Sequence, residues 1–305
     1  MKRRDLFKTM GAAAAAGTMG SWLSPRDVQA VENNVKRASE PSKLEITDMR
    51  IVRMGPEWRR YVIRLDTNQG ISGYGEVRDG ASPTYALMLK SRILGENPCN
   101  VDKIFRQIKQ FGGHARQAGG VVAIEMACWD LAGKAWGVPC WQMLGGKFRD
   151  EIRLYADTPT SHDPVEMGNR LRERVERGFT FLKMDIGIGM LKGVEGTLSY
   201  PEGMTDTNRI MHPFTGIRIT EKGLQMFKDY AATVREIVGW KTPIAIDHFG
   251  HFPVEDCIKI AQALDPYNFA WYEDMVPWQL TDQYVMLRDS CETPILTGED
   301  IYLKE

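Results

Sequence analysis

The second half of the chain alternates between short apolar strands and amphipathic helices, and this rhythm restricts the fold more than any other feature. Strand patterns occupy Ile152–Asp157, Phe179–Ile186, Ile244–Phe249, Phe269–Glu273 and Ile295–Gly298. Helical patterns lie between them at Pro164–Arg177, Glu221–Val238, Val254–Leu264 and Thr281–Ser290. Such alternation predicts a parallel sheet, closed as a barrel or doubly wound. A closed (β/α)₈ barrel usually takes roughly 250 residues, so we expect residues 151–305 to form a partial TIM-type barrel that is truncated after its fifth strand.

The preceding region, residues 44–150, has a different pattern. Strand-like alternation at Leu44–Ile51, Tyr61–Leu65 and Ile71–Val77, with a turn at Asn68–Gly70, predicts a three-stranded antiparallel meander. Helical patterns follow at Pro83–Leu94, Val101–Phe111 and Ala118–Trp136. We therefore expect an α+β domain over residues 44–150, preceded by a polar linker at residues 31–43.

The N-terminus carries a targeting pattern. Arg3 and Arg4 stand in a basic start, Thr9–Leu23 is small and apolar, and Val28–Ala30 offers a small-residue cleavage site. This pattern predicts a twin-arginine signal peptide over residues 1–30 and export to the periplasm. The apolar run falls short of the ~20 residues that a membrane span needs, so no membrane association is expected after cleavage. A mitochondrial-type presequence or a basic tail is the alternative.

Charge and cysteine content exclude two classes of function. The formal net charge is −1, which gives no electrostatic reason to expect a nucleic-acid partner. The five cysteines include no CxxC pair, which argues against a zinc site. Cys128 and Cys257 lie in apolar helical patterns and are predicted to be core residues.

Three carboxylates end consecutive strand patterns. Asp247, Glu273 and Glu299 are separated by two equal intervals, each of one strand–helix unit. The carboxyl ends of barrel strands share one rim, which is where barrel enzymes build their active sites. Three like charges there repel one another unless a cation neutralises them. Oxygen donors suit a hard divalent cation, so the spacing predicts a Mg²⁺ site, although a single acidic residue after a strand is more often a helix cap.

Other candidate catalytic residues surround this predicted rim. Lys183 and Asp185 share one face of a strand. Lys183 could pair with the charges of the metal site, bind a substrate carboxylate, act as a base or form a structural ion pair with Asp185. His251 is a candidate general acid, whereas the neighbouring His248 is expected at the surface.

A long connection separates the second strand of the predicted barrel from its helix. It runs from Gly187 to Thr220 and contains Tyr200 and His212 as further catalytic candidates. A connection of this length is typical of a functional lid, and a disordered insertion or an oligomer contact is the alternative.

Several motifs together resemble one family. Ala123–Lys134, continuing to Pro139 and Leu144–Gly146, is similar to the first signature of the mandelate racemase/muconate lactonizing family of the enolase superfamily. Gly70–Glu76 resembles its cap-domain hairpin, and the three carboxylates match its Mg²⁺ ligands. The resemblance implies a cap domain over a modified (β/α)₇β barrel, with cap loops near Arg53–Arg59 and Val77–Thr84 facing the site.

The resemblance also implies an activity. We expect a Mg²⁺-dependent lyase that abstracts the proton α to a carboxylate, stabilises an enediolate and dehydrates a sugar acid, as a homo-oligomer. Asp185 stands where the family often has a second lysine, which argues against lysine-based racemisation. A racemase, epimerase or cycloisomerase of the same scaffold is one alternative, and a truncated non-catalytic remnant is another.

Overall fold

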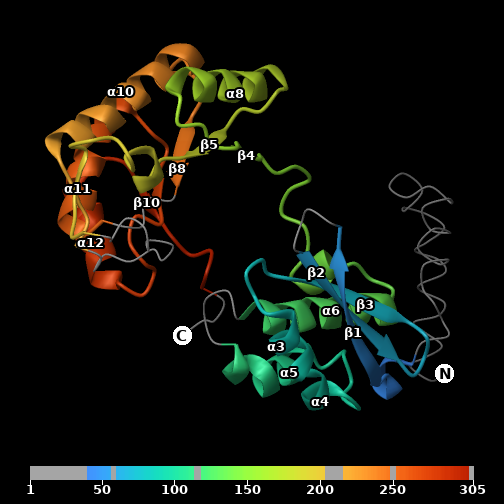
Figure 1. Cartoon of the computed structure of the whole chain (residues 1–305). Helices are drawn as coiled ribbons and strands as arrows, with labels where there is room; N and C mark the ends of the chain where they lie inside the picture. Colours follow the sequence, from blue (N-terminus) through green and yellow to red (C-terminus); the bar gives the residue numbers. More distant parts are fainter. Residues whose placement is uncertain (1–39, 56–59, 113–117, 203–215, 248–251, 302–305) are drawn as a thin grey trace, which may run out of the picture. The chain divides into compact units, whose positions relative to one another are not determined.

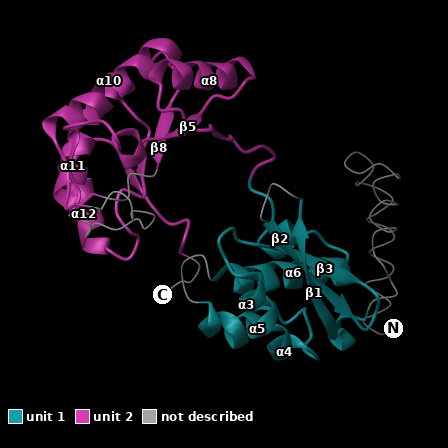
Figure 2. Cartoon of the chain, viewed as in Figure 1, with its two compact units in different colours: residues 1–148, 302–305 teal, residues 149–301 magenta. Residues whose placement is uncertain are grey.

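A computed structural model of the chain describes residues 40–55, 60–112, 118–202, 216–247 and 252–301. The chain divides into two compact units, residues 1–148 with 302–305, and residues 149–301 (Figure 2). The predicted signal peptide at residues 1–30 lies outside the described residues and stays a prediction. Among the helices of the described ranges, none is long and apolar enough to cross a membrane.

The first unit contains an antiparallel meander. Its strands are β1 (Ile46–Met54), β2 (Arg60–Thr67) and β3 (Ser72–Val77), hydrogen-bonded in the order β1-β2-β3. The three-stranded antiparallel arrangement predicted from the sequence is confirmed. Buried residues on one face, among them Ile63 and Leu65 of β2, belong to the hydrophobic core of this unit.

The helices of the first unit follow the sheet in the chain (Figure 1). They are α3 (Pro83–Met88), α4 (Lys90–Ile93), α5 (Val101–Ile108), α6 (Gly119–Trp136) and α7 (Cys140–Met143), with 3₁₀ turns at Pro41–Lys43 and Lys109–Phe111. The helix predicted over Pro83–Leu94 is interrupted at Leu89, whose ψ of −12° takes it out of the regular helical range. Its amide donates to the carbonyl of Ala86, three residues earlier, as in a 3₁₀ turn.

Two glycines let strand β3 lie directly against helix α6. A Cβ added at Gly75 would stand 1.9 Å from the carbonyl oxygen of Ala123, and one at Gly73 would stand 2.2 Å from that of Ala127. No side chain fits these distances, so the hairpin glycines permit the close approach of strand and helix.

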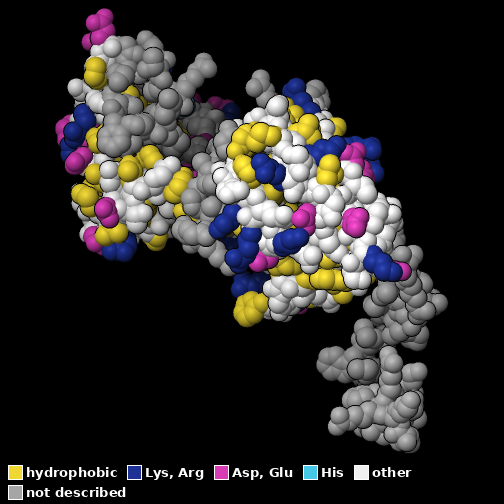
Figure 3. All heavy atoms as spheres, turned by 90° about the horizontal axis from the view of Figure 1, so that it is seen from below, with side chains coloured by type: hydrophobic (Ala, Val, Ile, Leu, Met, Phe, Trp, Pro, Cys, Tyr) yellow, Lys and Arg dark blue, Asp and Glu magenta, His cyan; other side chains and the backbone are white. Residues whose placement is uncertain are grey.

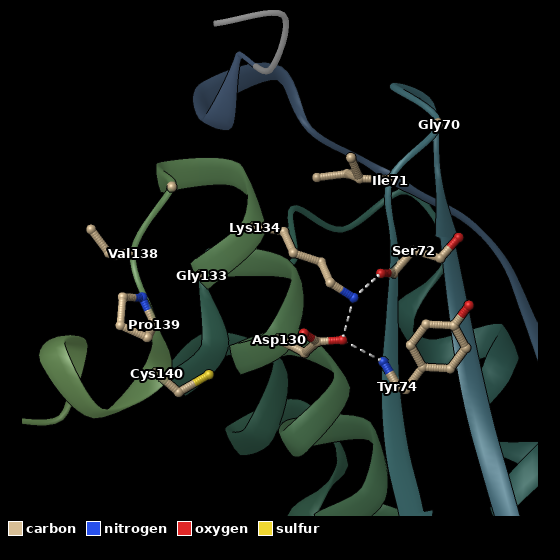
Figure 4. A pocket seen from close by; sticks show the side chains of 11 residues that line it. Gly70, Ile71, Ser72, Tyr74, Asp130, Gly133, Lys134, Val138, Pro139 and Cys140 are labelled. Carbon is tan, nitrogen blue, oxygen red and sulfur yellow. Dashed lines mark hydrogen bonds and ion pairs between the residues drawn. The ribbon is translucent and has the colours of Figure 1, made fainter. Parts of the chain in front are cut away.

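Side chains of α6 also form hydrogen bonds with backbone groups of β3 (Figure 4). The amide of Tyr74 donates to Asp130 Oδ2 at 3.0 Å, and Lys134 Nζ donates to the Ser72 carbonyl and to Asp130 Oδ2, both at 2.7 Å. β3 is an outer strand of the sheet, and outer strands otherwise present free backbone groups to other chains. Asp130 and Lys134, both in the sequence that resembles the family signature, thus satisfy part of this edge.

The second unit is built on a parallel sheet. Its strands are β4 (Ala156–Asp157), β5 (Leu182–Asp185), β8 (Ile244–Asp247), β9 (Tyr272–Glu273) and β10 (Ile295–Leu296), in the order β10-β9-β8-β5-β4. A parallel sheet with these five strands was predicted and is confirmed, although β4, β5, β9 and β10 are shorter than their patterns. The end of the pattern at Ile244–Phe249 lies outside the described residues. The truncation of the barrel stays a prediction.

Helices of the second unit pack on one face of its sheet (Figure 1). They are α8 (Pro164–Glu176), α10 (Glu221–Val238), α11 (Val254–Leu264) and α12 (Thr281–Ser290). Leu182, Met184 and Ile246 of the strands lie in the same buried cluster as residues of these helices. Because side chains alternate along a strand, Lys183, between Leu182 and Met184, points to the opposite face.

The long connection after β5 contains ordered structure at both of its ends. Strands β6 (Leu198–Ser199) and β7 (Arg218–Ile219) pair as a short antiparallel ribbon after a 3₁₀ turn at Ile188–Met190. The guanidinium of Arg218 makes two bonds to Asp256 of α11, at 2.7 and 2.9 Å, and the amide of Ile219 donates to the same carboxylate. The described ends of this connection are therefore fixed to α11.

The surface and the cysteines agree with the composition. On the face shown in Figure 3, side chains of both charges are interspersed among apolar ones, as expected for a chain whose formal net charge is −1. Cys128 and Cys257 are buried, as predicted, and the five cysteines are free thiols.

Candidate functional site

The three predicted carboxylates follow neighbouring strands of the parallel sheet. Asp247 is the last residue of β8, Glu273 is the last residue of β9, and Glu299 lies in a turn after β10. The side chains of Asp247 and Glu273 are buried, with residue exposures of 4% and 8%, whereas Glu299 is exposed. Since parallel strands end at the same edge, all three lie at the carboxyl edge of the sheet.

Lys183 of β5 joins the first two carboxylates. Its Nζ lies 2.5 Å from Asp247 Oδ2 and 3.0 Å from Glu273 Oε2. Burial lowers the pKa of Lys183, but the hydrogen bonds to the two carboxylates raise it by a larger amount. The pKa therefore lies above its ordinary value. Lys183 is therefore protonated at neutral pH and acts here as a cation that holds two carboxylates together.

Asp274, directly after Glu273, is a further acidic residue at this edge. Its pKa is raised to about 6, chiefly by burial; a hydrogen bond from Thr297 lowers it, and the nearby Asp247, Glu299 and Glu273 carboxylates add smaller upward contributions. Asp274 therefore shares the electrostatic environment of the predicted carboxylates. Sequence reasoning missed Asp274 because a strand pattern places adjacent side chains on opposite faces. The backbone leaves that pattern at Asp274, where φ is +48°.

Asp185 lies at the same edge. It is the cross-strand partner of Asp247 in the β5–β8 register, and its Oδ2 accepts a hydrogen bond from Thr160 Oγ1 at 2.9 Å. The ion pairs of Lys183 run across the strands to Asp247 and Glu273, which is the pairing with the metal-site carboxylates that the sequence allowed.

Aromatic side chains lie beside Glu273 and Lys183. Trp271 Nε1 donates to Glu273 Oε2 at 3.1 Å. The ring of Trp271 stacks on Phe181 with centroids 5.0 Å apart, and the edge of Tyr155 meets it at 6.0 Å. The Lys183 ammonium lies 5.5 Å from the Tyr155 ring centroid. These aromatic residues fix the orientation of Glu273 and Lys183, and no spacing in the sequence identified them.

The carboxylates at this edge are the kind of ligand that a hard cation needs, but their side chains are not grouped around one position. Carboxylate oxygens from adjacent strand ends are the ligands that Mg²⁺ prefers. Within the described parts of the chain, no three carboxylate, histidine or cysteine side chains are grouped closely enough to share a metal ion. The Lys183 ammonium lies between Asp247 and Glu273, so a cation that binds both must take the place of this ammonium.

The remaining catalytic candidates are not brought to this edge by the described structure. His212, His251 and His248 lie outside the described residues. Tyr200 follows β6, is 47% exposed, and lines a hollow formed by Leu191–Leu198 of its own connection. Its catalytic role stays a prediction.

Comparisons with known proteins match both halves of the chain. The sequence model "Mandelate racemase / muconate lactonizing enzyme, N-terminal domain" matches residues 27–145, and "Enolase C-terminal domain-like" matches residues 166–304. Among curated proteins, the chain is 29% identical over 271 residues to a D-xylonate dehydratase of Haloferax volcanii, covering 85% of this chain and 61% of the relative. It is 27% identical over 270 residues to a D-galactonate dehydratase family member of Cellvibrio japonicus, covering 84% of this chain and 65% of that protein.

The fold is similar to solved structures as well. A mandelate racemase/muconate lactonizing enzyme-like protein of Rubrobacter xylanophilus superposes with a TM-score of 0.72 at 27% identity. The match covers 85% of this chain and 68% of that structure. The chain thus spans about two thirds of the length of these relatives.

Proposed function

The chain belongs to the mandelate racemase/muconate lactonizing family of the enolase superfamily, and from this premise we propose that the protein is a Mg²⁺-dependent lyase that removes water from a sugar acid. The observation that carries the proposal is the meeting of Asp247 and Glu273 at adjacent parallel strand ends, with Glu299 after the next strand. Support for the substrate class comes from the relatives named for xylonate and galactonate dehydration.

Asp247, Glu273 and Glu299 would hold the cation. When bound, a divalent cation supplies positive charge that stabilises negative charge developing on the carboxylate of the substrate. Trp271 keeps Glu273 oriented through its indole N–H, so the ligand is held in place before the cation arrives.

Lys183 provides a second positive charge at the same edge. It is protonated, and its ammonium has three hydrogen-bond donors. With Asp247 and Glu273 holding a cation, the donors of Lys183 would be available to bind a substrate carboxylate. In this role Lys183 positions the acid and does not take its proton.

Asp185 is the described carboxylate best placed to move a proton. It ends strand β5, next to β8, and Thr160 holds one of its oxygens at 2.9 Å. An anionic carboxylate at this position can accept the proton α to the substrate carboxylate. His251 remains the candidate general acid for the departing hydroxyl group, and Tyr200 and His212 of the long connection remain the alternative candidates for the base.

The metal site can be tested by removing one charge at a time. We expect Asp247→Asn, Glu273→Gln and Glu299→Gln each to abolish the Mg²⁺ binding that isothermal titration calorimetry detects, because each removes an anionic ligand. Glu236→Gln, which changes an exposed carboxylate of α10, is the matched control and should bind like the wild type. Unchanged affinity in all three site variants would exclude the proposed cation site.

The reaction can be tested on a library of sugar acids. We expect one or more acids to lose water in the presence of Mg²⁺, with a keto-acid product detected by mass spectrometry, and no product after EDTA treatment. In D₂O, exchange of the α-proton without loss of water would identify an epimerase or racemase instead.

A further inference from the structure

We propose that Asp274 is a positioning residue that fixes the turn carrying Glu299 against the end of strand β9. The inference rests on the proposed function, because it concerns the third carboxylate of the cation site. It adds a residue that neither the spacing of the carboxylates nor the strand pattern identified.

Two hydrogen bonds connect Asp274 to the end of the neighbouring strand. Its amide donates to the carbonyl of Leu296 at 3.1 Å. Its Oδ1 accepts from Thr297 Oγ1 at 2.7 Å. Both partners directly precede Gly298 and Glu299, so one residue holds the start of the turn through its backbone and its side chain.

The backbone of Asp274 is bent to make this connection. Its φ of +48° lies in the left-handed region, which only glycine, asparagine and aspartate visit readily. Among the described residues, Asn268 is the other non-glycine residue with positive φ, and it ends the 3₁₀ turn at Asp265–Tyr267. Such conformations cost about 1–3 kcal/mol and persist where surrounding contacts impose them.

The segment after Asp274 is anchored on its other side. The hydroxyl of Tyr284, on helix α12, donates to the carbonyl of Val276. The chain from Glu273 to Val276 is therefore tied to α12 at one end and to the Thr297 hydroxyl at the other. This arrangement gives Asp274 a rigid base from which to hold the turn.

Glu299 is the most exposed of the three carboxylates. Asp247 and Glu273 are buried at the ends of strands, whereas Glu299 is exposed and follows Gly298, whose φ is +133°. Side chains that hydrogen-bond near a metal ligand and orient it typically change metal affinity by about 10- to 100-fold when they are removed. The Thr297–Asp274 hydrogen bond is a side-chain contact of this kind at the start of the Glu299 turn.

The test compares two substitutions of Thr297. Thr297→Val keeps the shape of the side chain and loses the donor, and we expect its Mg²⁺ affinity in titration calorimetry to fall about 10-fold or more. Thr297→Ser keeps the donor and should retain wild-type affinity. Asp274→Gly keeps the positive φ but loses the acceptor, so it should lose as much affinity as Thr297→Val. The double variant should lose no more than either single one, because both remove the same bond.

Two controls distinguish positioning of Glu299 by Asp274 from a contribution to folding alone. Thermal unfolding in EDTA should show that Thr297→Val and Asp274→Gly, like Thr297→Ser, are folded at the temperature of the titration, so that a lower Mg²⁺ affinity reports the position of Glu299 and not unfolding. If Thr297→Val and Asp274→Gly bind Mg²⁺ as tightly as the wild type and Glu299→Gln does not, the positioning role is overturned and the cation site stands. Wild-type affinity in Glu299→Gln would instead overturn the cation site itself.

Discussion

Arg235 illustrates at the residue scale how this fold accommodates a buried charge. The guanidinium donates to the carbonyls of Tyr267, Thr242 and Asn268, at 2.7, 3.0 and 2.6 Å. Burial lowers the pKa of Arg235 to about 10, so it remains charged at neutral pH. The charge is stabilised by peptide dipoles, and the side chain ties the end of α10 to Thr242, before β8, and to the 3₁₀ turn at Asp265–Tyr267.

Replacing Arg235 with methionine should destabilise the protein. Hydrogen bonds from a charged donor contribute about 1.5–3 kcal/mol each, and the change removes three of them, so we expect the free energy of unfolding to fall by about 3 kcal/mol or more. Urea denaturation followed by circular dichroism measures this difference. Arg172→Met, at an exposed position of α8, is the control. A loss as small as that of the control would show that the carbonyls find other partners.

Asp256 makes stability depend on pH. Burial raises its pKa, but hydrogen bonds from Arg218, the Ile219 amide and Lys259 lower it more, so the pKa lies below the ordinary value. A carboxyl group with a depressed pKa stabilises the folded state above its unfolded pKa of about 3.9 and loses this contribution as the pH falls toward the folded pKa. Unfolding measured between pH 5 and 2 should therefore show a shallower acid dependence in Asp256→Asn than in the wild type. Glu255→Gln, an exposed neighbour, should keep the wild-type slope.

The positions of single residues could be predicted from the sequence where strand alternation determines them. Asp247 and Glu273 end their strands as predicted, because apolar residues mark each strand clearly. The pairing of Lys183 with both of them depends on the order of the strands, which local patterns do not contain. Asp274 could not be predicted, since its side chain direction depends on a left-handed backbone conformation.

Gly75 determines how closely two elements of the first unit can pack. An added Cβ would meet the carbonyl oxygen of Ala123 at 1.9 Å, and backbone atoms cannot move away as a flexible side chain can. We expect Gly75→Ala to destabilise the protein by about 3 kcal/mol or more, at the upper end of overpacking effects. Thermal or urea unfolding measures the change. Gly189→Ala, where the nearest atom outside the adjacent residues is 3.8 Å away, should have little effect, and an equally small effect at Gly75 would contradict the steric argument.

Helices were predicted more accurately than strands, for a physical reason. The bounds of α10, α11 and α12 coincide with the sequence patterns, because a helix satisfies its hydrogen bonds within one segment and has local end signals such as the Thr220 cap. A strand exists only where a neighbour pairs with it. The pattern at Ile152–Asp157 yields a strand only at Ala156–Asp157, and the apolar Ile152 and Leu154 are 73% and 67% exposed.

At the scale of the whole molecule, the described residues form two separate hydrophobic cores. The core of the first unit and that of the second have no residue in common. The alternation of strands and helices predicted the second architecture, and the meander pattern predicted the first. The completeness of the barrel depends on strand pairs beyond the local patterns and stays a prediction.

The two cores should respond separately to damage. We expect hydrogen exchange, followed by mass spectrometry, to show that Gly75→Ala increases exchange in β1–β3 and α6, because they share one core with the altered contact. Amides of α10 and α11, which belong to the other core, should exchange at the wild-type rate. An equal increase in both sets would show that the chain unfolds as a single cooperative body.

The contact between Trp271 and Glu273 equips the protein with an intrinsic optical probe. An indole whose N–H is bound to an ionised carboxylate changes its emission when that carboxylate changes partners. Binding of a cation or substrate at this edge of the sheet can therefore be followed by fluorescence without attaching a dye. A variant in which Trp271 is replaced serves as the blank.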